Sequence, residues 1–102
     1  MNTIGTFTKD GERYTGTINT LKFSGTAVIE PITERKSEDS PNYQILGGRS
    51  RVEIGAAWKE RSERGTEYLA ARIDEPSFPA PVFCRLVQFE GEQHYRLIWS
   101  RT

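Results

Sequence analysis

The chain has 102 residues, with 14 lysines and arginines balanced by 14 aspartates and glutamates, so its formal net charge is zero. This length corresponds to a single domain covering residues 1–102, and the neutral balance argues against a strongly basic protein that wraps duplex DNA. The only cysteine, Cys84, excludes an intrachain disulfide and favours a cytoplasmic, reducing location. No apolar run is long enough to span a membrane, so no membrane association is expected.

The first predicted hairpin surrounds the dipeptide Asp10-Gly11, which lies between two segments of alternating polarity. An Asp-Gly pair in this setting indicates a type I′ turn, because both central residues of that turn need a positive φ. The register that follows places Phe7 opposite Tyr14.

A third apolar segment extends from Leu21 to Ile32, and Pro31 indicates that the strand ends there or lies at a sheet edge. Residues 33–42 are polar and charged and end next to a proline, so they are expected to form a mobile loop. Residues 43–46 then form a short fourth strand.

Residues 52–74 alternate between apolar and polar side chains on both sides of a polar turn at residues 62–65. A period of two is typical of half-buried strands. Closing the turn as a four-residue loop places Trp58 opposite Leu69 on the core side of the sheet and Lys59 on the other side.

The last predicted hairpin joins residues 82–89 to residues 93–101. Cys84 falls on the core side, where it is expected to be a buried, inert thiol. Arg85 is expected directly opposite Arg96, and such a like-charge pair is unfavourable unless a carboxylate or a bound phosphate neutralises it.

These hairpins predict a compact all-β domain of about seven or eight antiparallel strands, arranged as a small barrel or a sandwich. Alternation alone does not distinguish the two architectures. A short helix between residues 51 and 64 is the main alternative, although the apolar residues of this segment follow period two rather than 3.6.

The residue types that catalysis or metal binding requires are scarce in this chain. The single histidine, His94, falls on the face of the predicted hairpin opposite Cys84, so the two cannot form a catalytic couple. Zinc needs about four nitrogen or sulfur ligands, and the chain offers two, His94 and Cys84. The sequence also has no glycine-rich phosphate-binding loop and no turn motif centred on a nucleophilic serine. We therefore expect a protein that is not an enzyme and that carries no metal or cofactor.

Four stretches resemble a known family: IGTFTKDGERYTGTI (residues 4–18), IGAAW (54–58), EYLAARIDEPSFPAP (67–81) and LIWSR (97–101). This bacterial family is catalogued as domain of unknown function 736, and the resemblance covers nearly the whole chain. The family is known mainly from plasmids and integrative elements of proteobacteria and has no established activity. The resemblance thus implies a mobile-element setting and assigns no functional residues.

One face of the predicted sheet interleaves basic and aromatic side chains: Lys59, Tyr68, Arg72, Phe83, Arg85, His94 and Arg96. Exposed aromatic rings flanked by arginines form a platform on which single-stranded nucleic acid can stack. We therefore hypothesise an accessory protein of a mobile element that binds single-stranded nucleic acid, or another anionic partner, through this face. A second interpretation is that another layer of the fold buries the face, leaving its arginines paired with acids at the rim.

A different functional hypothesis is a protein–protein interaction module that inhibits or adapts a host complex, such as a defence nuclease. Zero net charge fits this hypothesis better than it fits nucleic-acid binding. The sequence leaves the partner and the oligomeric state open.

Overall fold

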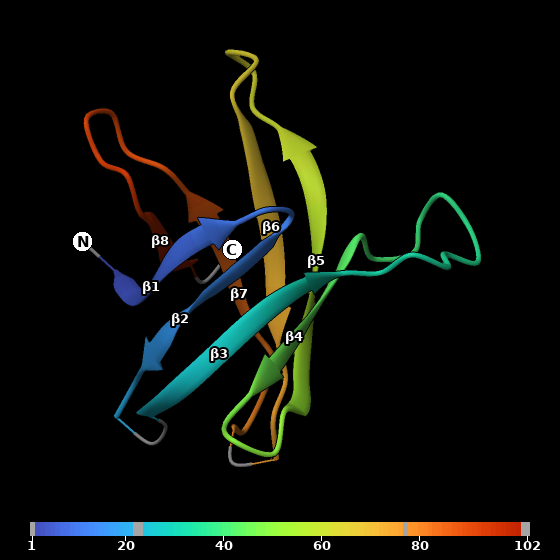
Figure 1. Ribbon diagram of the computed structural model, residues 1–102, viewed down its shortest axis with the longest axis vertical. Coiled ribbons are helices and arrows are strands. Elements are labelled where there is room, and N and C mark those ends of the chain that lie inside the picture. Colours follow the sequence, from blue (N-terminus) through green and yellow to red (C-terminus); the bar gives the residue numbers. More distant parts are fainter. Residues whose placement is uncertain (1, 22–23, 77, 101–102) are drawn as a thin grey trace.

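The computed structural model describes residues 2–21, 24–76 and 78–100, which form eight antiparallel strands and contain no helix (Figure 1). The strands are β1 (Thr3–Asp10), β2 (Arg13–Asn19), β3 (Ser24–Pro31), β4 (Tyr43–Gly47), β5 (Val52–Arg61), β6 (Glu67–Ile73), β7 (Val82–Val87) and β8 (Tyr95–Ser100). Each strand pairs with the next in sequence, and β8 pairs with β1, so the sheet closes into a barrel. The all-β prediction is confirmed, and of its two architectures the chain adopts the barrel.

The core fills the inside of this barrel with side chains that alternate with outward residues along each strand. The interior of an eight-stranded barrel is just wide enough for such filling. Burial of each large apolar side chain contributes about 1.5–3 kcal/mol to the hydrophobic stabilisation. The largest fully buried side chains are Phe7, Ile18, Ile29, Ile45, Ile73, Leu86 and Leu97.

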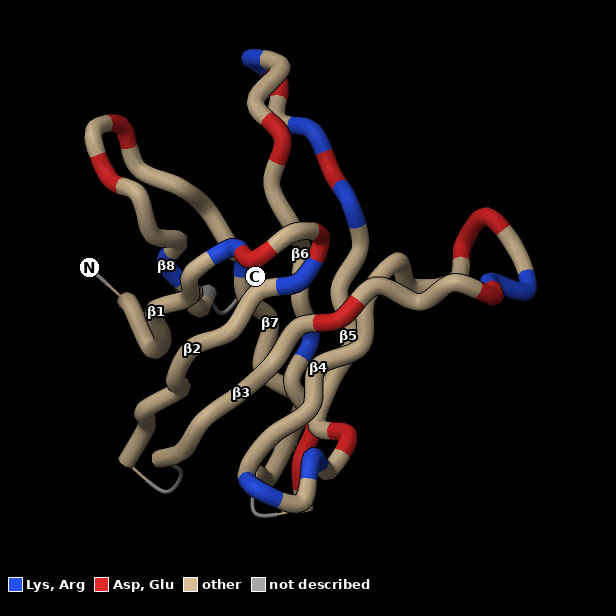
Figure 2. Tube along the Cα trace, viewed as in Figure 1, with Lys and Arg blue, Asp and Glu red and all other residues tan. Residues whose placement is uncertain are grey.

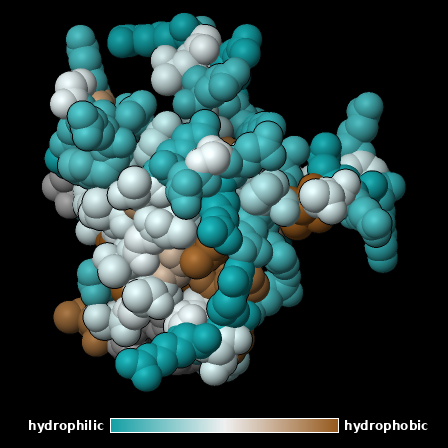
Figure 3. Space-filling view, in the orientation of Figure 1, coloured by the Kyte–Doolittle hydropathy of each residue, from teal (hydrophilic) through white to brown (hydrophobic). Residues whose placement is uncertain are grey.

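The two ends of the barrel differ. Strands β2, β4 and β6 end at the lower end of the barrel in Figure 1, where Phe78 packs against the core beside Ile18, Ile54 and Ile73. The connections after β1, β3, β5 and β7 surround the other end, which is open and which we call the mouth. Charged residues gather at these connections (Figure 2), and the surface of the mouth-side tips is hydrophilic (Figure 3).

The middle of the chain follows the sequence prediction in outline. Residues 32–42 form no strand and project from the barrel as a loop between β3 and β4 (Figure 1). The expected third strand begins at Ser24 rather than Leu21, and Leu21 is fully exposed. Residues 22 and 23 of that predicted segment lie outside the described part of the chain.

Strand β5 departs from the predicted alternation because of a β-bulge. Opposite the step from Ile45 to Leu46 in β4, strand β5 carries one extra residue, Ile54. A bulge shifts the parity of every residue that follows it. Trp58 therefore points outward, whereas Leu69 is buried inside the barrel, and the prediction that these two share the core side is wrong.

The strand pairing of the first and last hairpins is shifted by two residues from the prediction. Phe7 pairs with Gly16 rather than with Tyr14, because the tight turn is formed by Gly11 and Glu12 instead of Asp10-Gly11. Gly11 has a φ of 66° and Glu12 does not have a positive φ, as expected for a type II′ turn rather than type I′. A shift of two keeps each side chain on its predicted face, so Phe7 and Tyr14 are both buried.

Gly16 allows the backbones of β1 and β2 to lie unusually close together. A Cβ atom at this position would lie 1.9 Å from the carbonyl oxygen of Thr6 and 2.8 Å from Cα of Phe7. Both obstacles are backbone atoms of the paired strand, so neither can rotate away. Phe7, which pairs with Gly16, is completely buried, and the absence of a side chain at residue 16 leaves room for this arrangement.

We expect the substitution Gly16→Ala to lower the free energy of unfolding by about 1–3 kcal/mol or to prevent folding, because the new methyl group displaces the backbone of β1. Gly47→Ala is the matched control, since its Cβ would meet only the flexible end of the Ile54 side chain, at 2.9 Å. Urea denaturation of both variants measures the difference. Equal losses at the two positions would contradict the close approach at Gly16.

Candidate functional site

Four of the seven residues predicted for the binding face lie together on the outside of the barrel: Tyr68, Arg72, Phe83 and Arg85. The first two are outward residues of β6 and the last two are outward residues of β7. Arg72 pairs directly with Phe83 across these strands. Phe83 is 52% exposed, so the face is not covered by another layer of the fold.

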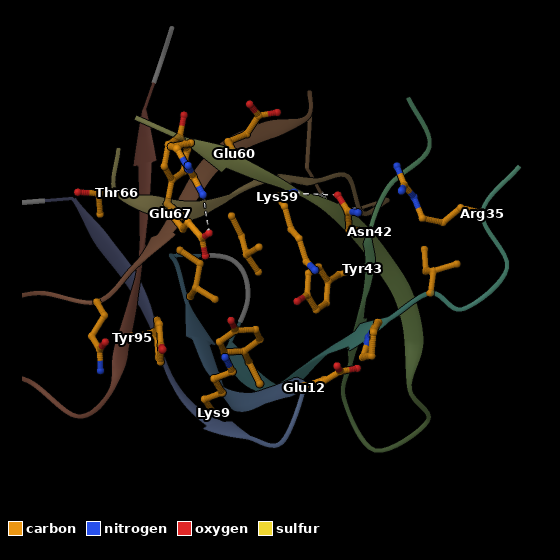
Figure 4. Close-up of a pocket in the computed structure, with 18 of the residues that line it drawn as sticks. Lys9, Glu12, Arg35, Asn42, Tyr43, Lys59, Glu60, Thr66, Glu67 and Tyr95 are labelled. Carbon is orange, nitrogen blue, oxygen red and sulfur yellow. Dashed lines mark hydrogen bonds and ion pairs between the residues drawn. The ribbon is translucent and has the colours of Figure 1, made fainter. Parts of the chain in front are cut away.

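Lys59 does not belong to this face, and the expectation that it does is wrong. The bulge at Ile54 turns its side chain to the inside of the barrel, where it pairs with Leu69 and lines the mouth (Figure 4). Trp58 takes its place on the outside. The sequence signal for this exchange was Ala56-Ala57, two small residues that fit either face and leave the parity of the strand undetermined.

His94 and Arg96 also lie apart from the other four residues. His94 precedes β8 rather than belonging to it, and its Nε2 atom lies 3.6 Å from a carboxylate oxygen of Glu92. Arg96 points outward from β8, but Glu92 binds its guanidinium at 2.5 Å and the ring of Phe89 lies 4.7 Å away. This basic group is therefore engaged within its own hairpin.

The expected opposition of Arg85 and Arg96 is wrong. Arg85 pairs with Ile98, and Arg96 pairs with Val87. The two-residue shift of the last hairpin separates the arginines along the strands, so no bound phosphate is needed to neutralise a like-charge pair there.

We call the outward residues Trp58, Tyr68, Arg72, Phe83 and Arg85 the outer platform. Within it, the guanidinium carbon of Arg72 lies 5.9 Å from the centre of the Trp58 ring, and that of Arg85 lies 5.2 Å from the centre of the Tyr68 ring. Both distances fall within the range of cation–π attraction. Arginine and aromatic side chains thus form two mixed pairs that span β5, β6 and β7.

Small side chains keep the outer platform open. Ala70 lies between Trp58 on one side and Arg85 on the other, because it pairs with both residues across the sheet. Ala56 is the neighbour of Arg72 on β5. Since an alanine projects only a methyl group from the sheet, the rings and guanidinium groups stand above their surroundings.

The charges of the outer platform are positive and unpaired. Among the described residues, neither Arg72 nor Arg85 forms an ion pair, and both side chains are exposed. At one border, the Trp58 indole donates a hydrogen bond of 3.0 Å to the backbone carbonyl oxygen of Asp39, in the loop of residues 32–42, where three acidic residues outnumber two basic ones. That loop carries several carboxylates (Figure 2), so an anion is favoured on the β6–β7 side of the platform.

The remaining candidate chemistry is limited. Cys84 is buried, and burial raises the pKa of its thiol from 9.0 to about 12, so it is protonated and inert at neutral pH. Within residues 2–21, 24–76 and 78–100, no group of three His, Cys, Asp or Glu side chains is placed to hold a metal ion. The same residues contain no helix of the length and apolarity needed to cross a membrane.

A family model described as "Protein of unknown function (DUF736)" matches residues 3–102. No curated protein and no solved structure matches the chain.

We expect the free energy of unfolding to fall as the pH rises above 9, because the buried Cys84 keeps its proton while the unfolded chain releases it. The unfolded state then binds fewer protons than the folded state, which favours unfolding by up to about 1.4 kcal/mol per pH unit. Urea denaturation at neutral pH and between pH 9 and 10 measures this slope for the wild type and Cys84→Ala.

The alanine variant should have the shallower slope, whatever its stability at neutral pH. The interval below pH 10 is chosen because Tyr14, whose pKa burial raises from 10.0 to about 12, adds a similar loss at higher pH. Identical slopes for the two proteins would show that the thiol is not protected by burial.

Proposed function

The chain belongs to the family of proteins of unknown function DUF736, and we propose that it binds single-stranded nucleic acid on its outer platform. In this proposal the protein is not an enzyme and acts in the cytoplasm. The mobile-element setting that the family resemblance implies makes it an accessory protein of a plasmid or integrative element.

The observation that carries the proposal is the pairing with aromatic rings of exposed arginines that form no ion pair with a described residue. Arg72 lies by Trp58 and Arg85 lies by Tyr68, while Phe83, opposite Arg72 on β7, presents a half-exposed ring at one end of the platform. Bases stack on such rings with a gain of about 1–3 kcal/mol per base, and planar guanidinium groups contact phosphates or stack on bases.

The shape of the surface favours a single strand over a duplex. Stacking requires base faces, which a duplex hides, whereas a sheet platform typically accepts about two or three splayed bases. The platform crosses three neighbouring strands, roughly 10 Å at the usual spacing, which suits a run of that length. Zero net charge limits the phosphate contribution, so we expect modest affinity that depends on stacking.

A folded host protein is the second candidate partner, and exposed Phe83 is the observation that favours it. Tyrosine, tryptophan and arginine are the residue types that dominate binding energy in protein interfaces. A photo-crosslinking side chain at position 83 would distinguish the two candidates, because it would join the protein to an oligonucleotide in one case and to one defined polypeptide in the other.

We expect fluorescence polarisation at low salt to detect binding of labelled oligothymidine, and the double variant Arg72→Ala, Arg85→Ala to weaken it by about tenfold or more. Loss of two phosphate contacts should also lower the slope of log affinity against log salt by about 1.4. Phe83→Ala should weaken binding at every salt concentration without changing this slope, because it removes stacking and no charge.

Arg64→Ala is the matched control, since Arg64 is an exposed arginine of the β5–β6 turn outside the outer platform. Arg96→Ala should also have little effect, because Glu92 already engages this side chain. Equal weakening by all the arginine variants would indicate nonspecific charge attraction, and absence of binding to wild-type protein would overturn the proposal.

A further inference from the structure

The mouth of the barrel is a cavity of about 1000 Å³, and we call it the mouth cup (Figure 4). Below it, inward side chains such as Phe7, Ile45 and Leu97 are completely buried. At the mouth, the inward positions carry lysines and tyrosines in place of close-packed aliphatic residues. A volume of this size matches the upper range of small-molecule sites in proteins.

The base of the mouth cup is aromatic and apolar. The ring of Tyr14 meets the ring of Tyr95 edge-on at 5.1 Å and that of Tyr43 at 6.0 Å. Leu69 and Leu86, paired on β6 and β7, line the same cavity beside them. Such a surface favours contact with a flat, largely apolar group, through ring edges and faces and aliphatic side chains.

The tyrosines also supply polar ends. Burial is the main cause that raises the pKa of Tyr14 and of Tyr43, and Glu12 adds to the rise at Tyr43. Both hydroxyls are therefore protonated at neutral pH and can donate hydrogen bonds into the cavity.

Two lysines stand on opposite walls of the mouth cup. Lys9 lies on β1 and Lys59 on β5, which are four strands apart in the closed order of eight. Neither ammonium group forms an ion pair with a described residue, and the Lys9 Nζ atom lies 5.8 Å from the centre of the Tyr14 ring. Lys59 extends into the cavity alongside Tyr43 (Figure 4).

The other two cations of the mouth cup are engaged at its rim, whereas two of its three carboxylates, Glu12 and Glu60, form no ion pair with a described residue. Arg61 binds Glu67 at 2.9 Å, and Arg35 donates hydrogen bonds to backbone carbonyls of its own loop. Glu12 and Glu60 complete the set of carboxylates that line the cavity. The two lysines are thus the cations whose charge is free to act on a ligand.

We propose that the mouth cup binds a small organic anion that carries a planar ring. The ring packs against the tyrosines and leucines of the base, and the anionic group lies between Lys9 and Lys59. This site is distinct from the outer platform, because Lys59 and Leu69 point to the inside of the barrel and, of the platform residues, Tyr68 alone also borders the cavity.

Two dyes that differ in one charged group test this proposal. Anilinonaphthalene sulfonate is an anion that carries a planar naphthalene ring, and N-phenylnaphthylamine is its neutral counterpart. We expect the sulfonate to bind wild-type protein with a rise in fluorescence, and the double variant Lys9→Met, Lys59→Met to bind it about tenfold or more weakly. Binding of the neutral dye should be unchanged or stronger, since methionine keeps the apolar stem of each lysine.

Lys36→Met is the matched control, because Lys36 lies in the exposed loop of residues 32–42 and does not line the cavity. Near-ultraviolet circular dichroism establishes that each variant retains its packed core. Amide NMR spectra of wild-type protein should show dye-induced shifts around Tyr14, Tyr43 and Tyr95 and none at Arg72, Phe83 and Arg85, the platform residues of β6 and β7 that do not line the cavity.

Three results would overturn the proposal: no binding of the sulfonate to wild-type protein, equal affinity in the double lysine variant, or shifts confined to the outer platform. The double variant Arg72→Ala, Arg85→Ala should keep full dye affinity. Loss of oligonucleotide binding and loss of dye binding are therefore separate outcomes, and failure of one proposal leaves the other standing.

Discussion

The pairing of β1 with β8 is the constraint on which the rest of the molecule depends. It closes the sheet, so no strand is left with an unpaired edge, and it gives every strand residue either an inner or an outer position. The inner positions become a core that needs no second layer. The outer positions become surface, which is why Phe83 and the arginines beside it are exposed rather than buried under another sheet.

Within the closed barrel, the extra residue at Ile54 creates both candidate sites at once. Without this bulge, Trp58 would point inward and Lys59 outward, as simple alternation predicts. With it, Trp58 moves to the outer surface and forms a cation–π pair with Arg72, while Lys59 enters the mouth opposite Lys9. Bulges often redirect side chains near functional sites in this way. Here one bulge determines both which side chain of β5 joins the outer platform and which one enters the mouth.

The two surfaces combine cations with aromatic rings in different geometries, and the difference decides what each can bind. On the convex outside, arginines lie by aromatic rings, and the planar guanidinium suits stacked bases and phosphates of a chain that passes over the surface. In the concave mouth, flexible lysines stand above a tyrosine base, and a compact ammonium suits a single anionic group held inside a cavity. A chain with no net charge can present both, because its carboxylates gather at turns and loops (Figure 2).

The sequence by itself determined the all-β class, a loop over residues 33–42 and the burial of Cys84, because period-two alternation and turn residues are local signals. It also assigned the correct faces to Tyr68, Arg72, Phe83 and Arg85, since alternation is uninterrupted along β6 and β7 and the two-residue shift of the last hairpin preserves parity. Only the tertiary structure decided the closure of the barrel, the bulge at Ile54 and hence the exchange of Trp58 and Lys59. These depend on how one strand fits between two neighbours that are distant in sequence, and two adjacent alanines left the local pattern of β5 equally compatible with either face.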